Sequence, residues 1–163
     1  MAFDAYLKLD GITGESVRAG FEGWIEIYSF SMGASNPSRI GSGAAGAGAG
    51  KVDISSFNFM KKTDSSSPKM FQMCCEGKHF PKAQLVLNKA GGDKSISYLK
   101  YDFTEAFVES IQWSGASGGD DTPAESVSLS FGSVNVTYTP QKADGTPGSA
   151  VIAGWDVRKN AKL

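Results

Sequence analysis

The chain has 163 residues, which is room for about one domain with a single hydrophobic core, so we expect residues 1–163 to fold as one unit. Its 16 Lys and Arg residues balance 17 Asp and Glu residues, and this near-neutral charge argues against a nucleic-acid-binding protein, which needs an excess of cations. An apolar fraction of 40% with 20% charged residues is typical of a folded chain rather than a disordered one.

Apolar residues that alternate with polar ones predict strands in the first third of the chain. The first strand covers residues 3–9, and a second runs over residues 22–32. Because neither face of the second strand is cleanly polar, we expect both of its faces to be covered. A third strand, over residues 51–61, changes parity near residues 55–56, which is the pattern of a β-bulge.

One stretch with helical spacing interrupts this pattern. Ser67 is a suitable N-cap, and Pro68 is a suitable first helical residue. Apolar residues then recur at i, i+3 and i+4, and Gly77 is placed to end the helix in a left-handed conformation. The sequence therefore predicts one short helix over about residues 67–77.

The second half of the chain returns to strands. They are expected over residues 83–88, 96–113, 127–138 and 151–157. The long late strand changes parity at Gly132, where glycine suits a bulge. Roughly eight strands with hairpin-like connections indicate a mainly β protein, either a β-barrel or a sandwich.

A glycine-rich segment precedes the third strand and imitates a nucleotide-binding motif. Gly41, Gly43 and Gly46 match GxGxxG, but that motif must open a helix, and here a strand follows. A Walker A reading of residues 50–51 fails as well, because Val52 stands where Ser or Thr would bind magnesium. A flexible connection between two strands is the better interpretation.

Catalytic and metal-binding chemistry lacks the residues it needs. His79 is the single histidine, so a Ser-His-acid arrangement has one candidate base, placed at a helix-to-strand junction. One histidine with the adjacent Cys74 and Cys75 cannot supply a zinc site. Residues 120–121, both Asp, suggest a weak cation site or, more simply, a solvated turn. We therefore expect no catalytic residues, no metal and no cofactor.

Localisation follows from the same inspection. The two cysteines are neighbours, so a structural disulfide is not expected, which suits a reducing compartment. The first residues carry neither the basic nor the apolar region of a secretory signal, and no apolar run approaches the length of a membrane span. We expect a protein made in the cytoplasm without a signal peptide and not inserted in a membrane.

At this point the sequence resembles a known family. The stretch SSSPKMFQMCCEGKHFPKAQLVLNKAGG, residues 65–92, is similar to the helix-and-strand centre of the haemolysin-coregulated protein (Hcp) family. The opening FDAYLKLDGITGES, then GAGAGK, YTPQKADG and the final GWDVRKN fit in order, so the resemblance covers essentially the whole chain. One departure is the alanine content of residues 41–50, where a polyglycine segment is expected.

The resemblance implies a fold and a role. Hcp proteins are bacterial type VI secretion tube subunits, each an antiparallel two-sheet β-barrel with a helix at its side. Six copies form a ring with a central channel, rings stack into a tube inside a contractile sheath, and the tube is secreted under a spike protein into the extracellular space or a target cell. Some rings carry or chaperone effector proteins in the lumen. The resemblance implies no enzymatic activity.

Two sets of residues become candidates under this resemblance. A loop that contacts the next ring would contain Gly41, Gly43, Gly46, Gly48 and Gly50. On the second strand, Ser29 and Ser31 lie opposite Phe30 and Met32. If the apolar pair packs inside, the serines face either the lumen, where they would contact effectors, or a neighbouring subunit.

Two other functions remain open from the residues alone. One is a monomeric β-barrel that binds a small ligand. The other is a hydrolase with an unrecognised site, which the single histidine disfavours.

Overall fold

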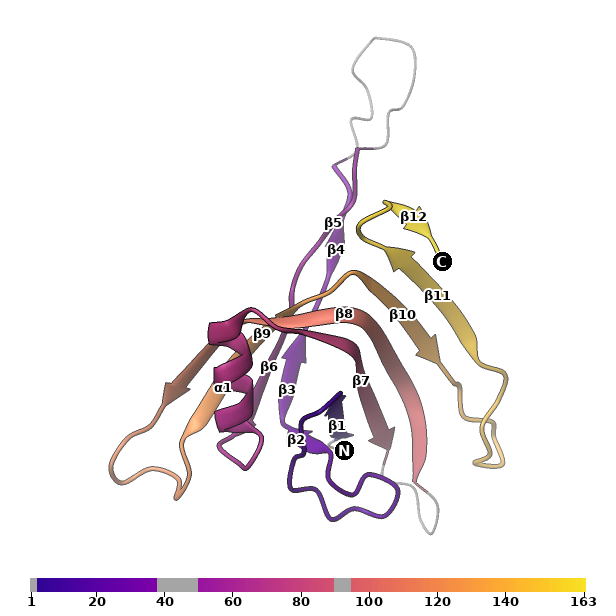
Figure 1. Cartoon of the computed structure of the whole chain (residues 1–163). Coiled ribbons are helices and arrows are strands. Elements are labelled where there is room, and N and C mark those ends of the chain that lie inside the picture. Colours follow the sequence, from indigo (N-terminus) through magenta and orange to yellow (C-terminus); the bar gives the residue numbers. More distant parts are fainter. Residues whose placement is uncertain (1–2, 38–49, 90–94) are drawn as a thin grey trace.

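A computed structural model describes residues 3–37, 50–89 and 95–163, and strands dominate it (Figure 1). The strands of the first half are β1 (Phe3–Leu9), β2 (Ile25–Ile27), β3 (Ser29–Ser31), β4 (Ala34–Ser35), β5 (Asp53–Ile54) and β6 (Phe57–Lys62). After the helix α1 (Ser67–Glu76) come β7 (His79–Lys89), β8 (Ile96–Ser114), β9 (Ala124–Ser130), β10 (Ser133–Tyr138), β11 (Val151–Asp156) and β12 (Ala161–Lys162).

The 19-residue strand β8 organises the sheet. It pairs with β7, and it pairs with β10 along its first half and β9 along its second half, always antiparallel. The strand order along one path is β12-β11-β10-β8-β7-β1-β2, and a branch runs from β8 through β9 and β6 to β3. The predicted mainly β, antiparallel fold with one short helix is therefore confirmed. Among the described residues, the pairings form one ten-stranded sheet and the two-stranded ribbon β4–β5, rather than a closed barrel.

Aromatic and aliphatic side chains from most strands form one core. The largest apolar side chains that are almost fully buried are Phe57, Phe59, Phe80, Phe103, Leu7, Leu9, Ile25, Met70, Leu85 and Leu129. Several of the phenyl rings are in contact, such as those of Phe57 and Phe103, whose centroids are 5.1 Å apart. Burying each such side chain contributes about 1.5–3 kcal/mol, so this interior is the main source of stability.

The predicted strand over residues 22–32 is two short strands with a change of face between them. Ile25 and Ile27 are buried in β2, which pairs with β1, whereas β3 turns Phe30 toward the core and pairs with β6. Tyr28 sits at the change, is 49% exposed, and donates its backbone N–H to the carbonyl of Met60. The expectation that both faces are covered is therefore wrong for β2, because the strand passes from one partner to another and leaves its outer face in solvent.

The two predicted bulges are strand breaks instead. Residues 55–56 separate β5 from β6, which belong to different sheets, and residues 131–132 separate β9 from β10. Among the described strands, the register shifts lie between Leu87 and Asn88 and between Val108 and Ser110. The N–H of Gly132 donates to the carbonyl of Thr104 at 2.9 Å. A Cβ on Gly132 would lie 3.1 Å from Nε of Arg158, a contact that this half-exposed side chain could relieve by a small shift.

The helix is confirmed, and its N-cap is corrected. Ser66, not Ser67, precedes it, in helical geometry and without a side-chain capping bond. Ser67 is instead buried, and its hydroxyl serves the interior contact described below. Gly77 ends the helix with a φ of 64°, the left-handed conformation expected of it. Among the described residues, no helix has the length and apolar character to span a membrane.

Candidate functional site

The residues proposed for chemistry do not come together. His79 is exposed, and its ring stacks against that of Phe107 with centroids 5.4 Å apart. Cys74 is half-buried and Cys75 is exposed, and both are free thiols. Over residues 3–37, 50–89 and 95–163, no group of three His, Cys, Asp or Glu side chains could hold a metal ion.

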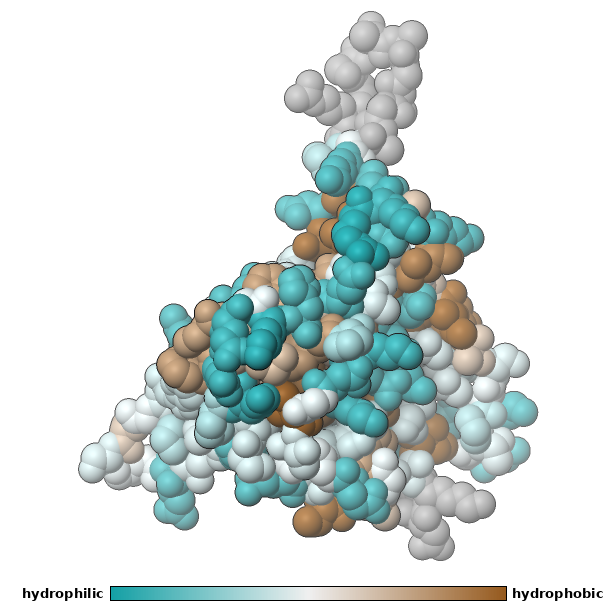
Figure 2. Space-filling model, in the orientation of Figure 1, coloured by the Kyte–Doolittle hydropathy of each residue, from teal (hydrophilic) through white to brown (hydrophobic). Residues whose placement is uncertain are grey.

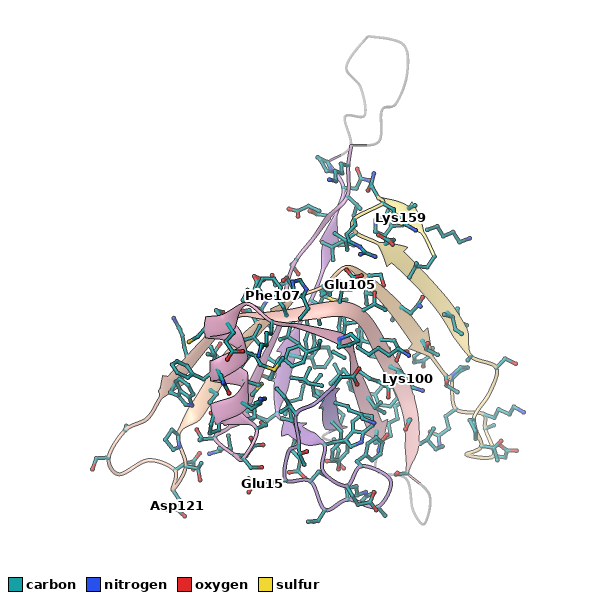
Figure 3. The ribbon with its side chains drawn as sticks, in the orientation of Figure 1. Glu15, Lys100, Glu105, Phe107, Asp121 and Lys159 are labelled. Atoms are coloured by element: carbon teal, nitrogen blue, oxygen red, sulfur yellow. The ribbon has the colours of Figure 1, made fainter. Side chains whose placement is uncertain are left out.

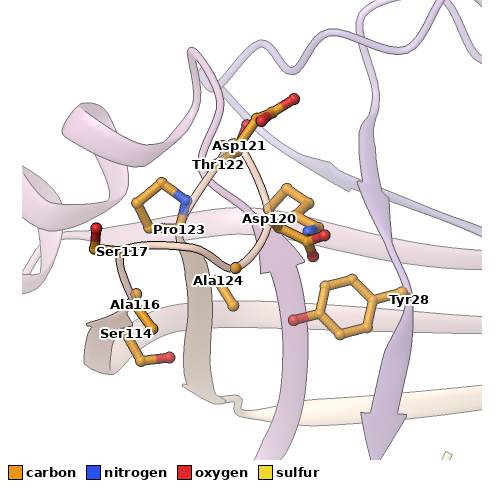
Figure 4. A pocket seen from close by; sticks show the side chains of 12 residues that line it. Tyr28, Ser114, Ala116, Ser117, Asp120, Asp121, Thr122, Pro123 and Ala124 are labelled. Atoms are coloured by element: carbon orange, nitrogen blue, oxygen red, sulfur yellow. The ribbon is translucent and has the colours of Figure 1, made fainter.

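The acidic turn at residues 120–121 serves an ion pair. Asp120 pairs with Lys62, and a hydrogen bond from that ammonium group is the main reason why the pKa of Asp120 lies below its ordinary value. This turn forms one wall of an open groove of about 850 Å³ whose opposite side is Tyr28 (Figure 4). Since Lys62 neutralises one of the two carboxylates, the cation-site interpretation of this turn loses its support.

Ser29 and Ser31 lie on a sheet face made of four strands. The register of β3, β6, β9 and the end of β8 aligns residues of one face in rows across the sheet. One row is Ser31, Asn58, Ser128 and Ser110, and the next is Ser29, Met60, Ser126 and Gln112. We call these two rows the serine face. The opposite face of the same strands carries buried residues such as Phe59 and Val127, so the serine face points away from the core.

The serine face contains no charged side chain. Its hydroxyl and amide groups bond partly to each other: Ser128 donates to Oδ1 of Asn58, whose amide nitrogen donates to the carbonyl of Ser56 at 3.1 Å. Charges appear only beyond its ends, at the Lys62–Asp120 pair and at Glu109, which accepts from Ser56. Such a surface can offer hydrogen bonds and limited apolar contact through Met60, which is 37% exposed.

A buried polar cluster is the feature that sequence reasoning missed. Lys61 and Glu125 are both 0% exposed, and Nζ of Lys61 lies 2.8 Å from Oε2 of Glu125 and 2.9 Å from Oδ1 of Asp64. The ammonium group also donates to the Ser67 hydroxyl at 2.9 Å, and the indole N–H of Trp113 donates to Glu125. We call these five residues the Lys61 cluster. It joins β6, β8 and β9 to the start of α1.

The alternation of the strands contained a signal for this cluster. Lys61 has the parity of Phe57 and Phe59, and Glu125 has the parity of Val127 and Leu129. Charged residues at inward positions therefore pointed to a buried pair. In the register, Lys61 lies directly opposite Glu125, where the two long side chains can meet.

The proposed stacking loop lies mostly beyond what can be described. Gly41, Gly43, Gly46 and Gly48 are outside the described residues. Gly50 follows them, and a Cβ added to it would lie 2.9 Å from the Pro37 carbonyl oxygen, so two chain segments approach closely there. The ribbon β4–β5 comes next, pairs Ala34 with Ile54 and Ser35 with Asp53, and projects from the main body (Figure 1).

Comparisons with known proteins agree across the chain. A family model described as type VI secretion system effector, Hcp, matches residues 6–138. Protein hcp1 of Pseudomonas aeruginosa is 39% identical over 163 residues, which is 99% of each chain. The solved structure of a type six secretion system protein has a TM-score of 0.94 at 36% identity and covers 99% of this chain and 100% of its own. Hcp1 from Salmonella typhimurium has a TM-score of 0.82 at 34% identity, with 100% of both chains covered.

These similarities define a class: a secreted structural protein of the type VI secretion system, not an enzyme. Within that class, the chain belongs to the Hcp family. The resemblance stated from the sequence motifs is thereby confirmed.

Proposed function

We propose that this protein is a subunit of the inner tube of a type VI secretion system. Six copies form a ring, rings stack inside the sheath below the spike protein, and the tube leaves the cell in which it was made. The observation that carries this proposal is the family match over residues 6–138 together with similarity to whole Hcp chains. The role needs no cofactor, nucleic acid or membrane insertion.

The proposal includes closure of the strands into the two-sheet barrel. β2 and β3 are separated by Tyr28 alone, yet β2 pairs with β1 and β3 pairs with β6. A continuous segment over residues 25–31 then links the two ends of the sheet, and residues 1–163 act as one domain. Closure suits a structural subunit because it leaves fewer open edges for unwanted pairing.

The rival function, a monomeric barrel that binds a small ligand, needs an interior cavity. The space between the strands is filled instead by phenyl and aliphatic side chains, among them Phe57, Phe80 and Phe103. In the part of the chain that the structure describes, the larger grooves open to solvent, as the one beside Tyr28 does (Figure 4). This packing favours a solid wall element over a ligand container.

The serine face is the proposed lumen surface. Ser29 and Ser31 belong to it, so the two hypothesised effector contacts share one uncharged sheet face. A channel wall that carries or chaperones different effectors should not favour one sign of charge. An uncharged face meets this need because it offers short-range hydrogen bonds without a strong electrostatic potential. If Ser29 and Ser31 instead contact a neighbouring subunit, they become buried when the ring forms. An electron-microscopy map of the ring would show whether they line the channel or lie between subunits.

The proposed stacking role belongs to the loop that contains Gly41, Gly43, Gly46, Gly48 and Gly50. Support comes from the projection of its base, the β4–β5 ribbon, away from the sheet (Figure 1). A ribbon that projects in this way supports a contact between this end of the molecule and the adjacent ring.

The deciding experiment measures the mass of the purified protein by sedimentation and examines it by negative-stain microscopy. We expect hexamers that appear as rings with a central opening. A monomer with no rings at any concentration would refute the tube function and revive the ligand-binding alternative.

A further inference from the structure

An apolar groove lies between the outer strands and the ribbon. It has a volume of about 280 Å³ and is lined by Met32 and Ile54 from the ribbon side and by Val136, Ala153 and Trp155 from β10 and β11. Val136 and Ala153 are register partners, so they lie on the same face of the sheet.

The strand β11, which lines this groove, carries large apolar side chains that the core does not cover. Val151 on the groove side is 65% exposed and Ile152 on the opposite side is 64% exposed, which is unusual for strand residues of this size. Figure 2 shows hydrophobic residues gathered on this flank of the molecule, around β11. The β10–β11 surface is therefore incompletely covered within one chain.

A second apolar feature lies on the opposite flank. Phe71 of α1 and Trp113 of β8 are 48% and 43% exposed, and their ring centroids are 5.5 Å apart. Trp113 is held in place by its bond to the buried Glu125, and α1 is packed on β8. The pair is a fixed aromatic protrusion, whereas the groove is a hollow.

The segments that follow the two features differ in charge. Residues 157–163, which follow the groove strand β11, contain three cations and no acidic side chain, and Lys162 lies opposite Trp155 in the register. Residues 115–123, which begin two positions after Trp113, contain Asp120 and Asp121 and no cation. Arg158 is paired with Glu105 and Asp120 with Lys62, so the contrast rests on Lys159 and Lys162 at the groove and on Asp121 near the aromatic pair. Figure 3 shows Lys159 and Asp121 on opposite sides of the molecule.

We infer that the groove receives the Phe71–Trp113 pair of a second copy of this chain. The inference rests on the proposed ring and specifies its subunit contact. A contact between two different surfaces on opposite flanks is heterologous, which is the kind that propagates from copy to copy and closes into a ring. Apolar contact supplies the attraction, and the basic tail faces the acidic turn of the neighbour and fixes the orientation.

Two matched pairs of variants test this contact. Ala153→Asp places a charge in the groove, and its control Ile152→Asp places the same charge on the opposite face of the same strand. Phe71→Asp removes the protrusion, and its control Gln72→Asp changes an exposed neighbour on α1. We expect Ala153→Asp and Phe71→Asp to be folded monomers by sedimentation and circular dichroism, and both controls to form rings.

Mixing supplies the decisive measurement. An equimolar mixture of the two monomeric variants contains one intact groove and one intact protrusion, so it should form a 1:1 dimer and no ring. A mixture that stays monomeric, or either disruptive variant forming rings as the unmodified chain does, would overturn the contact. If the unmodified chain forms rings while these variants are unaffected, only this inference fails. If the unmodified chain is itself monomeric, the proposed function fails with it.

Discussion

The Lys61 cluster gives the sharpest prediction of stability. In Lys61→Met, the buried carboxylate of Glu125 loses the ammonium group 2.8 Å away and keeps only the Trp113 indole as a partner. Breaking a buried ion pair by removing one side costs about 3–5 kcal/mol, because an uncompensated charge stays inside. Domains of this size are stable by only about 5–15 kcal/mol. The variant should therefore be folded but close to its limit.

A second substitution separates the trapped charge from lost packing. In Lys61→Met with Glu125→Gln, the carboxylate is replaced by a neutral amide whose oxygen still accepts from Trp113. We expect the double variant to recover at least about 2 kcal/mol of the loss. The matched surface control is Lys62→Met, since Lys62 is exposed and pairs with Asp120 in solvent. Its cost should stay below about 1 kcal/mol.

The assay is urea denaturation at one protein concentration, followed by tryptophan fluorescence and circular dichroism. The free energy of unfolding comes from the midpoint and slope, and unchanged slopes are required for the comparison. If Lys61→Met costs no more than Lys62→Met, the pair is not buried in solution. If the double variant is no more stable than the single one, the loss comes from packing and the reasoning about charge is wrong.

Further predictions concern a close backbone approach, a carboxylate and the two hypothesised contacts. A Cβ at Gly14 would lie 2.4 Å from a backbone carbonyl oxygen, so Gly14→Ala should cost about 1–3 kcal/mol in denaturation, whereas Gly33→Ala, with nothing within 4 Å, should cost far less. The pKa of Asp156 is lowered from 3.8, chiefly by a backbone N–H three residues on, so its ionised form stabilises the fold above that pH and this contribution is lost as pH falls below it. Asp156→Asn should thus lower the melting temperature at neutral pH, with the difference from the unmodified chain shrinking in acid; a constant difference would contradict this. Ser31→Arg should abolish effector retention in pull-down while rings persist, and full retention would count against the serine face. Deleting residues 43–49 should leave single rings but weaken their stacking in micrographs, and unchanged tubes would contradict the stacking role.

Local sequence patterns predicted the strands well because the alternation of apolar and polar residues depends only on the segment itself and on which of its faces is buried. Alternation located β1, and the parity change at Gly132 located the break between β9 and β10, although no bulge lies there. The helix end was predictable because Gly77 adopts a conformation that other residues avoid. The helix N-cap was misplaced by one residue: Ser66 precedes the helix, and the hydroxyl of Ser67 instead accepts hydrogen bonds from Lys61 and from the Asp64 backbone N–H.

Long-range partners explain what sequence patterns did not predict. The second predicted strand divides at Tyr28 because β2 pairs with β1 whereas β3 pairs with β6. The alternation of residues within the segment does not indicate which strands it will pair with. Ser29 and Ser31 could be assigned to a face, but the six residues that complete the serine face come from three other strands. Their alignment follows from the register, which is a property of the folded chain.

If the serine face lines the proposed lumen, its neutrality has a consequence for transport kinetics. The face itself gives an approaching molecule little electrostatic steering, so the rate of capture should change little with ionic strength. Contacts form one hydrogen bond at a time against a surface whose groups already satisfy part of their bonding with each other. In the proposed lumen, a passenger would then exchange hydrogen bonds with this wall for hydrogen bonds with water. A change of salt concentration would alter that exchange little.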